Sequence, residues 1–215
     1  MSIRLTRWGH ACIRLDRGDD RLVIDPGVFS DLPAALDGVA AVLVTHEHPD
    51  HVATEPLAEA VQGGGVQVWA PQSVVDALVE AGAPADRVHP VSAGDTFSAG
   101  GFDVAALGEW HALVHQDVPR IHNVGYLTEG VLHPGDAYVD PAGAQVDVLC
   151  TPLGAPWLKL GEVVDYVRSV GPRRIVVVHD ALLSAIGQGM AIGLLGRLGG
   201  AGEPVSLDPG EGIDL

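Results

Sequence analysis

The stretch "AVLVTHEHPDHV", residues 41 to 52, passes from an apolar segment directly into three histidines and an aspartate. The unbroken apolar run at residues 39–45 is typical of a strand buried on both faces. Neither a solvated loop nor a packed core requires so many imidazoles and a carboxylate at this point. Imidazole nitrogens and carboxylate oxygens suit zinc, iron or manganese, and no cysteine accompanies them to suggest a structural thiolate site. The stretch therefore predicts a metal site where a buried strand ends.

The spacing inside this stretch indicates two ions rather than one. His46 and His48 alternate along the chain, so at a strand end they can point to a common side. Pro49 has a fixed φ and keeps His48 extended. Asp50 and His51 follow after the chain has turned, which offers ligands to a neighbouring ion. The alternative, a polar surface loop, would have to explain several ligand-type side chains within six residues.

The rest of the chain alternates between short strand and helix patterns. Strands are predicted at residues 3–8, 11–16, 21–25, 39–45, 66–70, 87–91, 96–107, 123–129, 130–135, 146–152 and 173–180, and helices at 53–62, 71–82, 161–171 and 182–199. The early strands look mostly antiparallel, and a Gly/Pro-rich tail ends the chain. These patterns predict stacked sheets with helices outside. Because no linker-like segment or fixed-period repeat interrupts them, we expect one domain over residues 1–215.

Composition restricts the partners. The formal net charge of −16 and only 12 basic residues among 215 disfavour a nucleic-acid or membrane partner. No apolar run approaches the ~20 residues of a membrane helix, and the first residues do not resemble a signal peptide. The two cysteines, Cys12 and Cys150, are expected to be free buried thiols. We therefore expect a cytoplasmic protein.

His46-x-His48-x-Asp50-His51 after an apolar strand resembles the signature of the metallo-β-lactamase superfamily. The flanking motifs agree: "WGHACIRL" at residues 8–15, "RLVIDPG" with Asp25, "HPGD" with Asp136 and "VVVHD" with His179. Their order is most similar to the small-hydrolase branch near the L-ascorbate-6-phosphate lactonases. The resemblance implies an α/β fold, an αββα four-layer sandwich, with a two-metal site between the sheets at one edge.

The resemblance also implies which residues bind the two ions. His46 and His48 would hold the first ion, Asp50, His51 and His179 the second, and Asp136 would bridge them. The third histidine of the first ion has several candidates. His111 is favoured because it follows a strand pattern where a loop begins, and the alternatives are His115, His122 and His133.

Other residues of these motifs admit two roles each. The resemblance implies that Asp25 accepts a hydrogen bond near a ligand, although an Asp before Pro-Gly also forms turns. His10 would act beside the substrate or the ligands, or would simply pack. Trp8, Trp110 and Trp157 could line a pocket or form half-buried scaffold. His89 is expected to be structural.

The function implied is that of a metal-dependent hydrolase with two divalent ions, zinc first and manganese or iron next. The ions would generate hydroxide from a shared water and polarise an ester, lactone, amide or phosphodiester in a small molecule. Asp50 or Asp136 would accept a proton, and His115 or His122 could stabilise the oxyanion or protonate the leaving group. Two alternatives are an iron oxidoreductase of the same fold, similar to persulfide dioxygenases, and a non-catalytic metal-binding module. The latter would predict a lost ligand, yet every ligand class is present.

Overall fold

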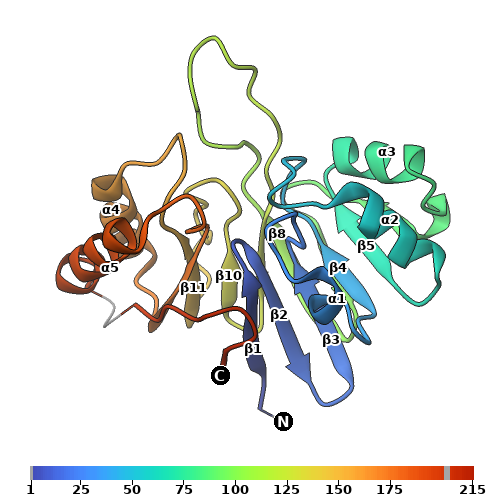
Figure 1. Ribbon diagram of the computed structural model, residues 1–215, viewed down its shortest axis with the longest axis horizontal. Coiled ribbons are helices and arrows are strands. Elements are labelled where there is room, and N and C mark those ends of the chain that lie inside the picture. Colours follow the sequence, from blue (N-terminus) through green and yellow to red (C-terminus); the bar gives the residue numbers. More distant parts are fainter. Residues whose placement is uncertain (1, 201–203) are drawn as a thin grey trace.

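The computed structural model describes residues 2–200 and 204–215. Two β-sheets face each other, and helices cover the outer face of each (Figure 1). Helices α1 (Leu32–Ala35), α2 (Thr54–Gln62) and α3 (Gln72–Glu80) lie on the first sheet, and α4 (Leu160–Val170) and α5 (Ala185–Leu198) on the second. This arrangement is the αββα four-layer sandwich, so the predicted fold class is confirmed.

The first sheet has seven strands. Their order is β13 (Gly212–Asp214), β1 (Arg4–Gly9), β2 (Cys12–Arg17), β3 (Asp20–Ile24), β4 (Ala41–Leu43), β5 (Gln67–Ala70) and β6 (Val88–Pro90). Strands β1 to β3 are antiparallel, whereas β3 to β6 are parallel, so the expectation of mostly antiparallel early strands is wrong for this half of the sheet. Parallel neighbours need a crossover, and α1, α2 and α3 provide the three crossovers. The carboxyl ends of β3 and β4 consequently lie at the same edge.

The second sheet has six strands. Their order is β12 (Arg174–Val178), β11 (Val148–Pro152), β10 (Val131–His133), β9 (Gly125–Thr128), β8 (Phe102–Leu107) and β7 (Thr96–Ala99). Strands β7 to β10 are antiparallel, and β10 to β12 are parallel. The strands β8, β10 and β12 therefore run in one direction, and the loops that follow them leave from the same edge.

The core between the sheets is apolar. It ends below the edge from which the loops after β8, β10 and β12 leave. Large side chains of both sheets pack together there, including Leu5, Leu43, Phe102 and Val176. Tyr126 is fully buried, and its hydroxyl donates to the carbonyl oxygen of Val44 at 2.9 Å. Because β9 carries Tyr126 and Val44 follows β4, this hydrogen bond fixes one sheet against the other next to the histidine-rich loop.

Three elements differ from the sequence prediction. The predicted strand at 96–107 is a hairpin, because Gly100 and Gly101 adopt φ of 56° and 85° and turn the chain between β7 and β8. The Gly/Pro-rich tail contains a strand, β13, which pairs with β1. The short helix α1 begins after Asp31, whose carboxylate caps it by accepting from Ala34 N. No helix in the described residues has the length and apolarity needed to cross a membrane.

The close packing of two loops at Gly27 gives a test of the fold. A Cβ at Gly27 would lie 1.9 Å from the carbonyl oxygen of Asp50, because the loop after β3 runs directly against the loop after β4. Gly27→Ala should therefore lower the free energy of unfolding by about 1–3 kcal/mol. In Gly189→Ala, on α5, the new Cβ would meet no described atom within 4 Å. This control should be neutral or slightly stabilising in urea unfolding, and equal midpoints for both variants would contradict the close packing.

Candidate metal centre

The seven predicted ligands lie together at one edge of the sandwich. They come from four loops, each of which follows a strand that ends there: His46, His48, Asp50 and His51 after β4, His111 after β8, Asp136 after β10 and His179 after β12. All of them are buried except His48 and Asp50, which are partly buried, and Glu47 between the ligands is exposed. The topology of two different sheets thus brings residues separated by more than 130 positions to one place.

The first cluster contains His46, His48, His111 and Asp136. One ligand atom of each lies within 4.8 Å of the others. His46 Nε2 is 3.1 Å from His48 Nδ1, and His111 Nε2 is 3.4 Å from Asp136 Oδ2. Three imidazoles and one carboxylate around one centre form a ligand set that suits zinc, iron or manganese.

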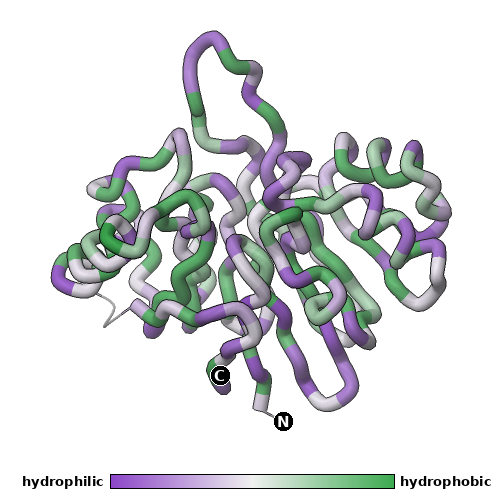
Figure 2. Tube along the Cα trace, in the orientation of Figure 1, coloured by the Kyte–Doolittle hydropathy of each residue, from purple (hydrophilic) through white to green (hydrophobic). Residues whose placement is uncertain are grey.

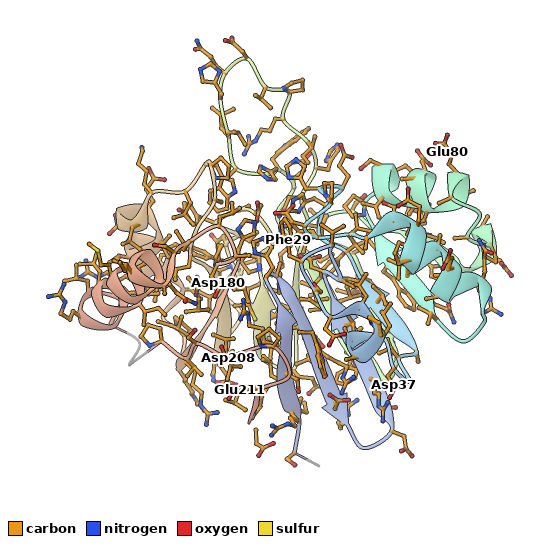
Figure 3. The ribbon with its side chains drawn as sticks, in the orientation of Figure 1. Phe29, Asp37, Glu80, Asp180, Asp208 and Glu211 are labelled. Atoms are coloured by element: carbon orange, nitrogen blue, oxygen red, sulfur yellow. The ribbon has the colours of Figure 1, made fainter. Side chains whose placement is uncertain are left out.

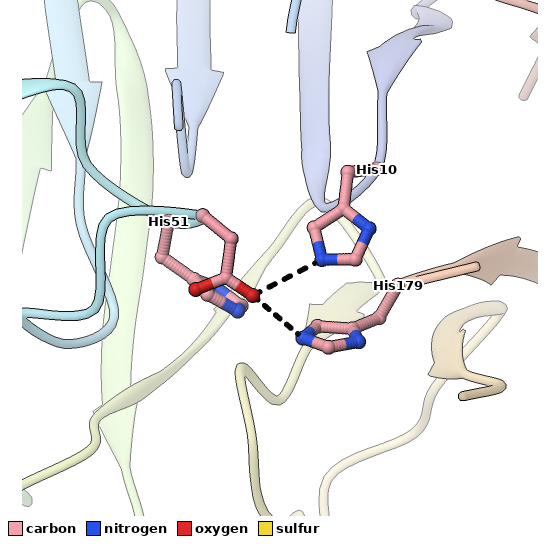
Figure 4. Close-up of side chains that lie close together, drawn as sticks. His10, His51 and His179 are labelled. Atoms are coloured by element: carbon pink, nitrogen blue, oxygen red, sulfur yellow. Dashed lines mark hydrogen bonds and ion pairs between the residues drawn. The ribbon is translucent and has the colours of Figure 1, made fainter. Parts of the chain in front are cut away.

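The second cluster contains His10, Asp50, His51 and His179, again with one ligand atom each within 4.8 Å. The Asp50 carboxylate lies between two rings. Its Oδ2 is 3.2 Å from His10 Nε2 and 3.3 Å from His179 Nε2, the two contacts dashed in Figure 4. The second cluster is therefore as dense in ligands as the first.

Asp136 faces both clusters. Its Oδ2 points toward His111, whereas Oδ1 lies 3.2 Å from His51 Nε2 and 3.3 Å from His179 Nε2. The indole Nε1 of Trp157 donates to Oδ2 at 2.9 Å, and Asn123 Oδ1 accepts from the backbone N–H of Asp136 at 2.9 Å. The carboxylate is thus held with one oxygen toward each group of histidines.

Hydrogen bonds behind the rings set their tautomers. His51 Nδ1 donates to Asp25 Oδ2 at 2.6 Å, His111 Nδ1 to the carbonyl oxygen of Ala112 at 2.6 Å, and His179 Nδ1 to that of Gly154 at 2.7 Å. Since Nδ1 carries the proton of each neutral ring, the Nε2 lone pair is directed at the centre. The sequence admitted two roles for Asp25, and the structure gives it the contact with a candidate ligand.

The Thr45 hydroxyl extends this arrangement to His46. It donates to Asp25 Oδ2 at 2.8 Å and lies 3.0 Å from His46 Nδ1. A hydroxyl that has donated its proton accepts from the ring, so His46 also presents Nε2 to the centre. One buried carboxylate, Asp25, therefore orients candidate ligands in both clusters.

Four buried atoms at this centre have no hydrogen-bond partner among the described residues. They are Nε2 of His51, His111 and His179 and Oδ1 of Asp136. Buried polar atoms are nearly always paired, and each unpaired one costs roughly 1–3 kcal/mol. All four lie where the two clusters meet. When the three rings are neutral with the proton on Nδ1 and Asp136 is ionised, each of these atoms offers a lone pair to a cation. The residues therefore fit a pair of cations.

The charge of the side chains agrees with this fit. Burial would raise the pKa of Asp136, but the neighbouring His51 lowers it well below its usual range. Burial would lower the pKa of His179, but its contacts with Asp136 and Asp50 raise it to about 9. Burial lowers the pKa of His46 well below its usual value. The carboxylates are anionic at neutral pH, and in the absence of metal a proton on His179 balances part of their charge.

The backbone is strained at three points around the centre. His10, Asp25 and His179 have φ of 43°, 54° and 55°, a region that non-glycine residues rarely adopt. Backbone hydrogen bonds hold two of them, from Asp25 N to Leu43 O at 2.9 Å and from His179 N to His10 O at 3.0 Å. Such strain is concentrated at functional sites, where surrounding contacts maintain it.

The role of His10, which the sequence left open, follows from its two ring nitrogens. Its Nδ1 accepts from the backbone N–H of Ala181 at 3.3 Å. The proton of the neutral ring is then on Nε2, which donates to Asp50 Oδ2. A protonated nitrogen cannot bind a metal. His10 therefore orients Asp50, although its position within the second cluster resembles that of a ligand.

A buried ion pair holds the neighbouring loop. Arg7 on β1 contacts the carboxylate of Asp180, the residue after His179, and also donates to the carbonyl oxygen of Leu207 at 2.6 Å. Arg7 and Asp180 are both buried. The turn that carries the last candidate ligand is thus attached to the first strand and to the C-terminal segment.

None of the alternatives to His111 belongs to either cluster. His115 is exposed and accepts from Asp117 N, and His122 is exposed and stacks on Trp110 with ring centroids 4.3 Å apart. His133 is buried beside Asp25 and donates to the carbonyl oxygen of Ala11 at 2.8 Å. His89 bonds to Gln67, and Trp8 lies beside Arg14. Of these residues only His133 is near the centre, and its ring supports the turn before Asp136.

Two histidines of one loop provide a matched test of the first cluster. His111→Ala should reduce the metal content from about two ions to about one per chain, because a buried ligand is lost. His115→Ala should keep the wild-type content, since its side chain is exposed. Elemental analysis after reconstitution with zinc measures both. The opposite pattern would identify His115, rather than His111, as the third histidine of the first ion.

His10 allows orientation and ligation to be distinguished. If Nε2–H orients Asp50, His10→Ala should still bind two cobalt ions at saturation, with affinity for the weaker ion lowered about 10–100-fold. His10→Gln retains an N–H donor and should recover part of that loss. Calorimetry and the visible spectrum of the cobalt-loaded protein report affinity and ligand number separately. Loss of the second ion at saturation, with a changed spectrum, would make His10 a ligand.

Comparison with known proteins places this geometry in a family. A model described as "Beta-lactamase superfamily domain" matches residues 4–179. Protein Rv0786c of Mycobacterium tuberculosis is 37% identical over 201 residues, which cover 90% of this chain and 91% of that protein. UPF0173 protein PF0020 of Pyrococcus furiosus is 31% identical over 186 residues, covering 82% and 83%. A Mesorhizobium japonicum protein named UPF0173 metal-dependent hydrolase is 28% identical over 116 residues, covering 51% and 48%.

Solved structures share the architecture. Igni18, described as a metallo hydrolase from Ignicoccus hospitalis, superposes with a TM-score of 0.76 at 18% identity and covers 100% of this chain and 99% of its own. CmlA, a diiron beta-hydroxylase from Streptomyces venezuelae, has a TM-score of 0.69 at 20% identity and covers 99% of this chain and 54% of its own. These likenesses concern the fold alone. Together with the family match and the relatives, they show that the chain belongs to the β-lactamase superfamily and has the metallo-β-lactamase fold.

Proposed function

We propose that this chain, a metal-dependent hydrolase of the metallo-β-lactamase fold, holds two divalent ions and cleaves an ester, lactone, amide or phosphodiester bond in a small molecule. The observation that carries the proposal is the Asp136 carboxylate, which has one oxygen toward each cluster, surrounded by buried ring nitrogens without partners. A single ion would leave one of the two clusters unsatisfied.

The ligand assignment follows the two clusters. His46, His48 and His111 would hold the first ion. Asp50, His51 and His179 would hold the second, and Asp136 would contact both. Five of the seven ligands are imidazoles, which favours zinc, with manganese or iron as alternatives.

When bound, the two ions would lower the pKa of a water between them and polarise the bond under attack. The residues of the chain have two further tasks, to orient the ligand rings and to transfer protons. Asp25 and the backbone carbonyls hold the rings in the tautomer that the ions need. Of the two candidate acids, Asp50 is the more accessible: its side chain is 23% exposed, whereas that of Asp136 is 5% exposed. We assign to Asp50 the acceptance of a proton from the attacking water and its delivery to the leaving group.

The surroundings support a small-molecule substrate in the cytoplasm. A net charge of −16 opposes binding of nucleic acid and of anionic membranes. Cys12 and Cys150 are free and buried, as in proteins of a reducing compartment.

Metal content and hydrolysis test the proposal together. The protein purified without chelator should contain about two transition ions per chain and hydrolyse at least one of a panel of aryl esters, lactones and activated phosphodiesters. Chelation should abolish the activity, and added metal should restore it. Oxygen uptake with a persulfide and no hydrolysis in the panel would instead make it an oxidoreductase, and trace metal after reconstitution with zinc, manganese or iron would refute the site.

Two carboxylate variants test the bridge. Asp136→Ala should lose at least one ion and nearly all activity, because the repulsion between two cations is no longer compensated. Asp25→Asn should cost only about 10–100-fold in affinity or activity, since Asp25 binds no ion itself and acts through His51 and, by way of Thr45, through His46. Asp86→Ala, at an exposed residue of the 3-10 turn Ala85–Arg87, is the control. Calorimetric titration measures the binding of metal, and circular dichroism verifies folding. Two tightly bound ions in folded Asp136→Ala would refute the bridging role of Asp136.

A further inference from the structure

Exposed apolar side chains are concentrated around the metal centre. Eleven large apolar residues of the described chain are exposed, and seven of them lie in three loops at the edge that carries the candidate ligands. These seven are Val28 and Phe29 after β3, Trp110, Leu113, Val114 and Val118 after β8, and Leu182 after β12. We call this set the apolar rim. The other four are on helices α3 and α5.

Two of the three loops of the rim have side chains beside residues of the site. The Phe29 ring meets the His10 ring edge-on with centroids 5.5 Å apart, and Phe29 lies where the strands end (Figure 3). Leu182 is three residues after His179. In the loop after β8, Leu113, Val114 and Val118 line a hollow of about 20 Å³ together with His48, His111 and Arg120, which is room for about one water molecule. Two candidate ligands of the first ion therefore lie beside apolar side chains of this loop.

The loop after β8 projects above the two sheets. Short apolar and short polar stretches follow one another along it (Figures 1 and 2). Leu113 is 59% exposed, Val118 47% and Leu182 57%, so the core does not explain why these residues are apolar. Loops on a rigid scaffold that expose clustered apolar side chains next to a site are typically binding surfaces.

The charged groups of the three loops are mostly engaged within the structure. Asp25 bonds to His51 and Thr45, Asp31 caps α1, and Asp180 contacts Arg7 and Gln188. Arg120 donates to the carbonyl oxygen of His111 at 2.7 Å, and its guanidinium lies over the Trp110 ring. In these described loops no group of cations is available to bind a phosphate, although the protein as a whole is highly charged.

We propose that the apolar rim binds the acyl chain of an uncharged carboxylic ester or lactone whose carbonyl lies at the metal centre. The proposal rests on the proposed hydrolase function and specifies its substrate class. In the reaction, a water oxygen bonds to the carbonyl carbon, the bond from that carbon to the alkoxy oxygen breaks, and one water proton passes to the departing oxygen. An ester gives a carboxylic acid with an apolar chain and an alcohol, whereas a lactone gives a single hydroxy acid that carries both groups. A phosphodiester has no matching cationic surface here.

Chain-length dependence tests this assignment. The probes are p-nitrophenyl acetate, butyrate, hexanoate and octanoate, with bis(p-nitrophenyl) phosphate for comparison. Burying one methylene contributes about 0.8 kcal/mol, which corresponds to about fourfold. We expect kcat/KM of the zinc-loaded enzyme to rise about two- to fourfold per methylene, mainly through KM, and to exceed that for the phosphodiester.

Matched variants locate the effect. Leu113→Ser with Val118→Ser should flatten the chain-length dependence, with the largest loss for octanoate. Val79→Ser, at an exposed apolar residue of α3 outside the rim, should leave both slope and rate as in the wild type. Calorimetry with acetate, hexanoate, octanoate and octyl phosphate measures binding affinity without any turnover. Octanoate should bind most tightly, and the double variant should lose that preference.

The outcomes separate the two proposals. If no probe is hydrolysed but octanoate binding depends on Leu113 and Val118, the hydrolase function fails and the apolar site stands. If esters are hydrolysed with a flat chain-length dependence, or the phosphodiester is preferred, the acyl-chain assignment is wrong. It is also wrong if the double variant behaves like Val79→Ser. Self-association abolished by the double variant, without any chain-length dependence, would mean that a second copy of the chain covers the rim.

Discussion

The position of the Asp136 carboxylate between two sets of imidazoles is the constraint on which the rest of this edge depends. A carboxylate that is 5% exposed can remain ionised only when positive charge surrounds it, and His51, His111 and His179 lie within 3.4 Å of it. Without an ion those contacts have poor hydrogen-bond geometry and leave four buried atoms unpaired. This edge therefore requires more positive charge than the side chains alone supply. Its other features hold the carboxylate of Asp136 and the imidazole rings in place.

The two sheets accomplish this through strand direction. Strands β4, β8, β10 and β12 all end at one edge, so each contributes ligands from the first residues of its loop. Loops are less rigid than strands, but ligands within a few residues of a strand end retain much of its rigidity. The Tyr126 hydrogen bond to Val44 then fixes the separation of the sheets close to the site. Packing, topology and ligand geometry thus depend on one another.

Much of this could be predicted from the sequence, because the strongest signals are local. The four ligand-type residues after β4 stand directly behind an apolar run, and His111 and His179 each follow a strand pattern. The fold class followed from the resemblance that these motifs carry. Trp157 was a candidate to line a pocket, but its hydrogen bond to Asp136 could not be predicted, because it spans 21 positions and no local pattern marks it. His10 stands in a recognisable motif, but its role depends on which ring nitrogen meets Ala181, and only the tertiary structure shows that. Strand β13 was missed because its pairing with β1 comes from the far end of the chain.

The attachment of Arg7 to both Asp180 and Leu207 links the chain ends to the reactive edge. The backbone of Arg7 also pairs with this segment, since its carbonyl oxygen accepts from Gly210 N at 2.7 Å and its N–H donates to Glu211 O at 3.0 Å. The termini themselves lie at the opposite pole of the molecule (Figure 1). For protein engineering this means that a label or immobilising tag at either terminus lies far from the candidate metal centre. Removal of residues 207–211 would in contrast release Arg7, which steadies the turn after β12, and so would loosen the loop that carries His179 from a segment at the far end of the sequence.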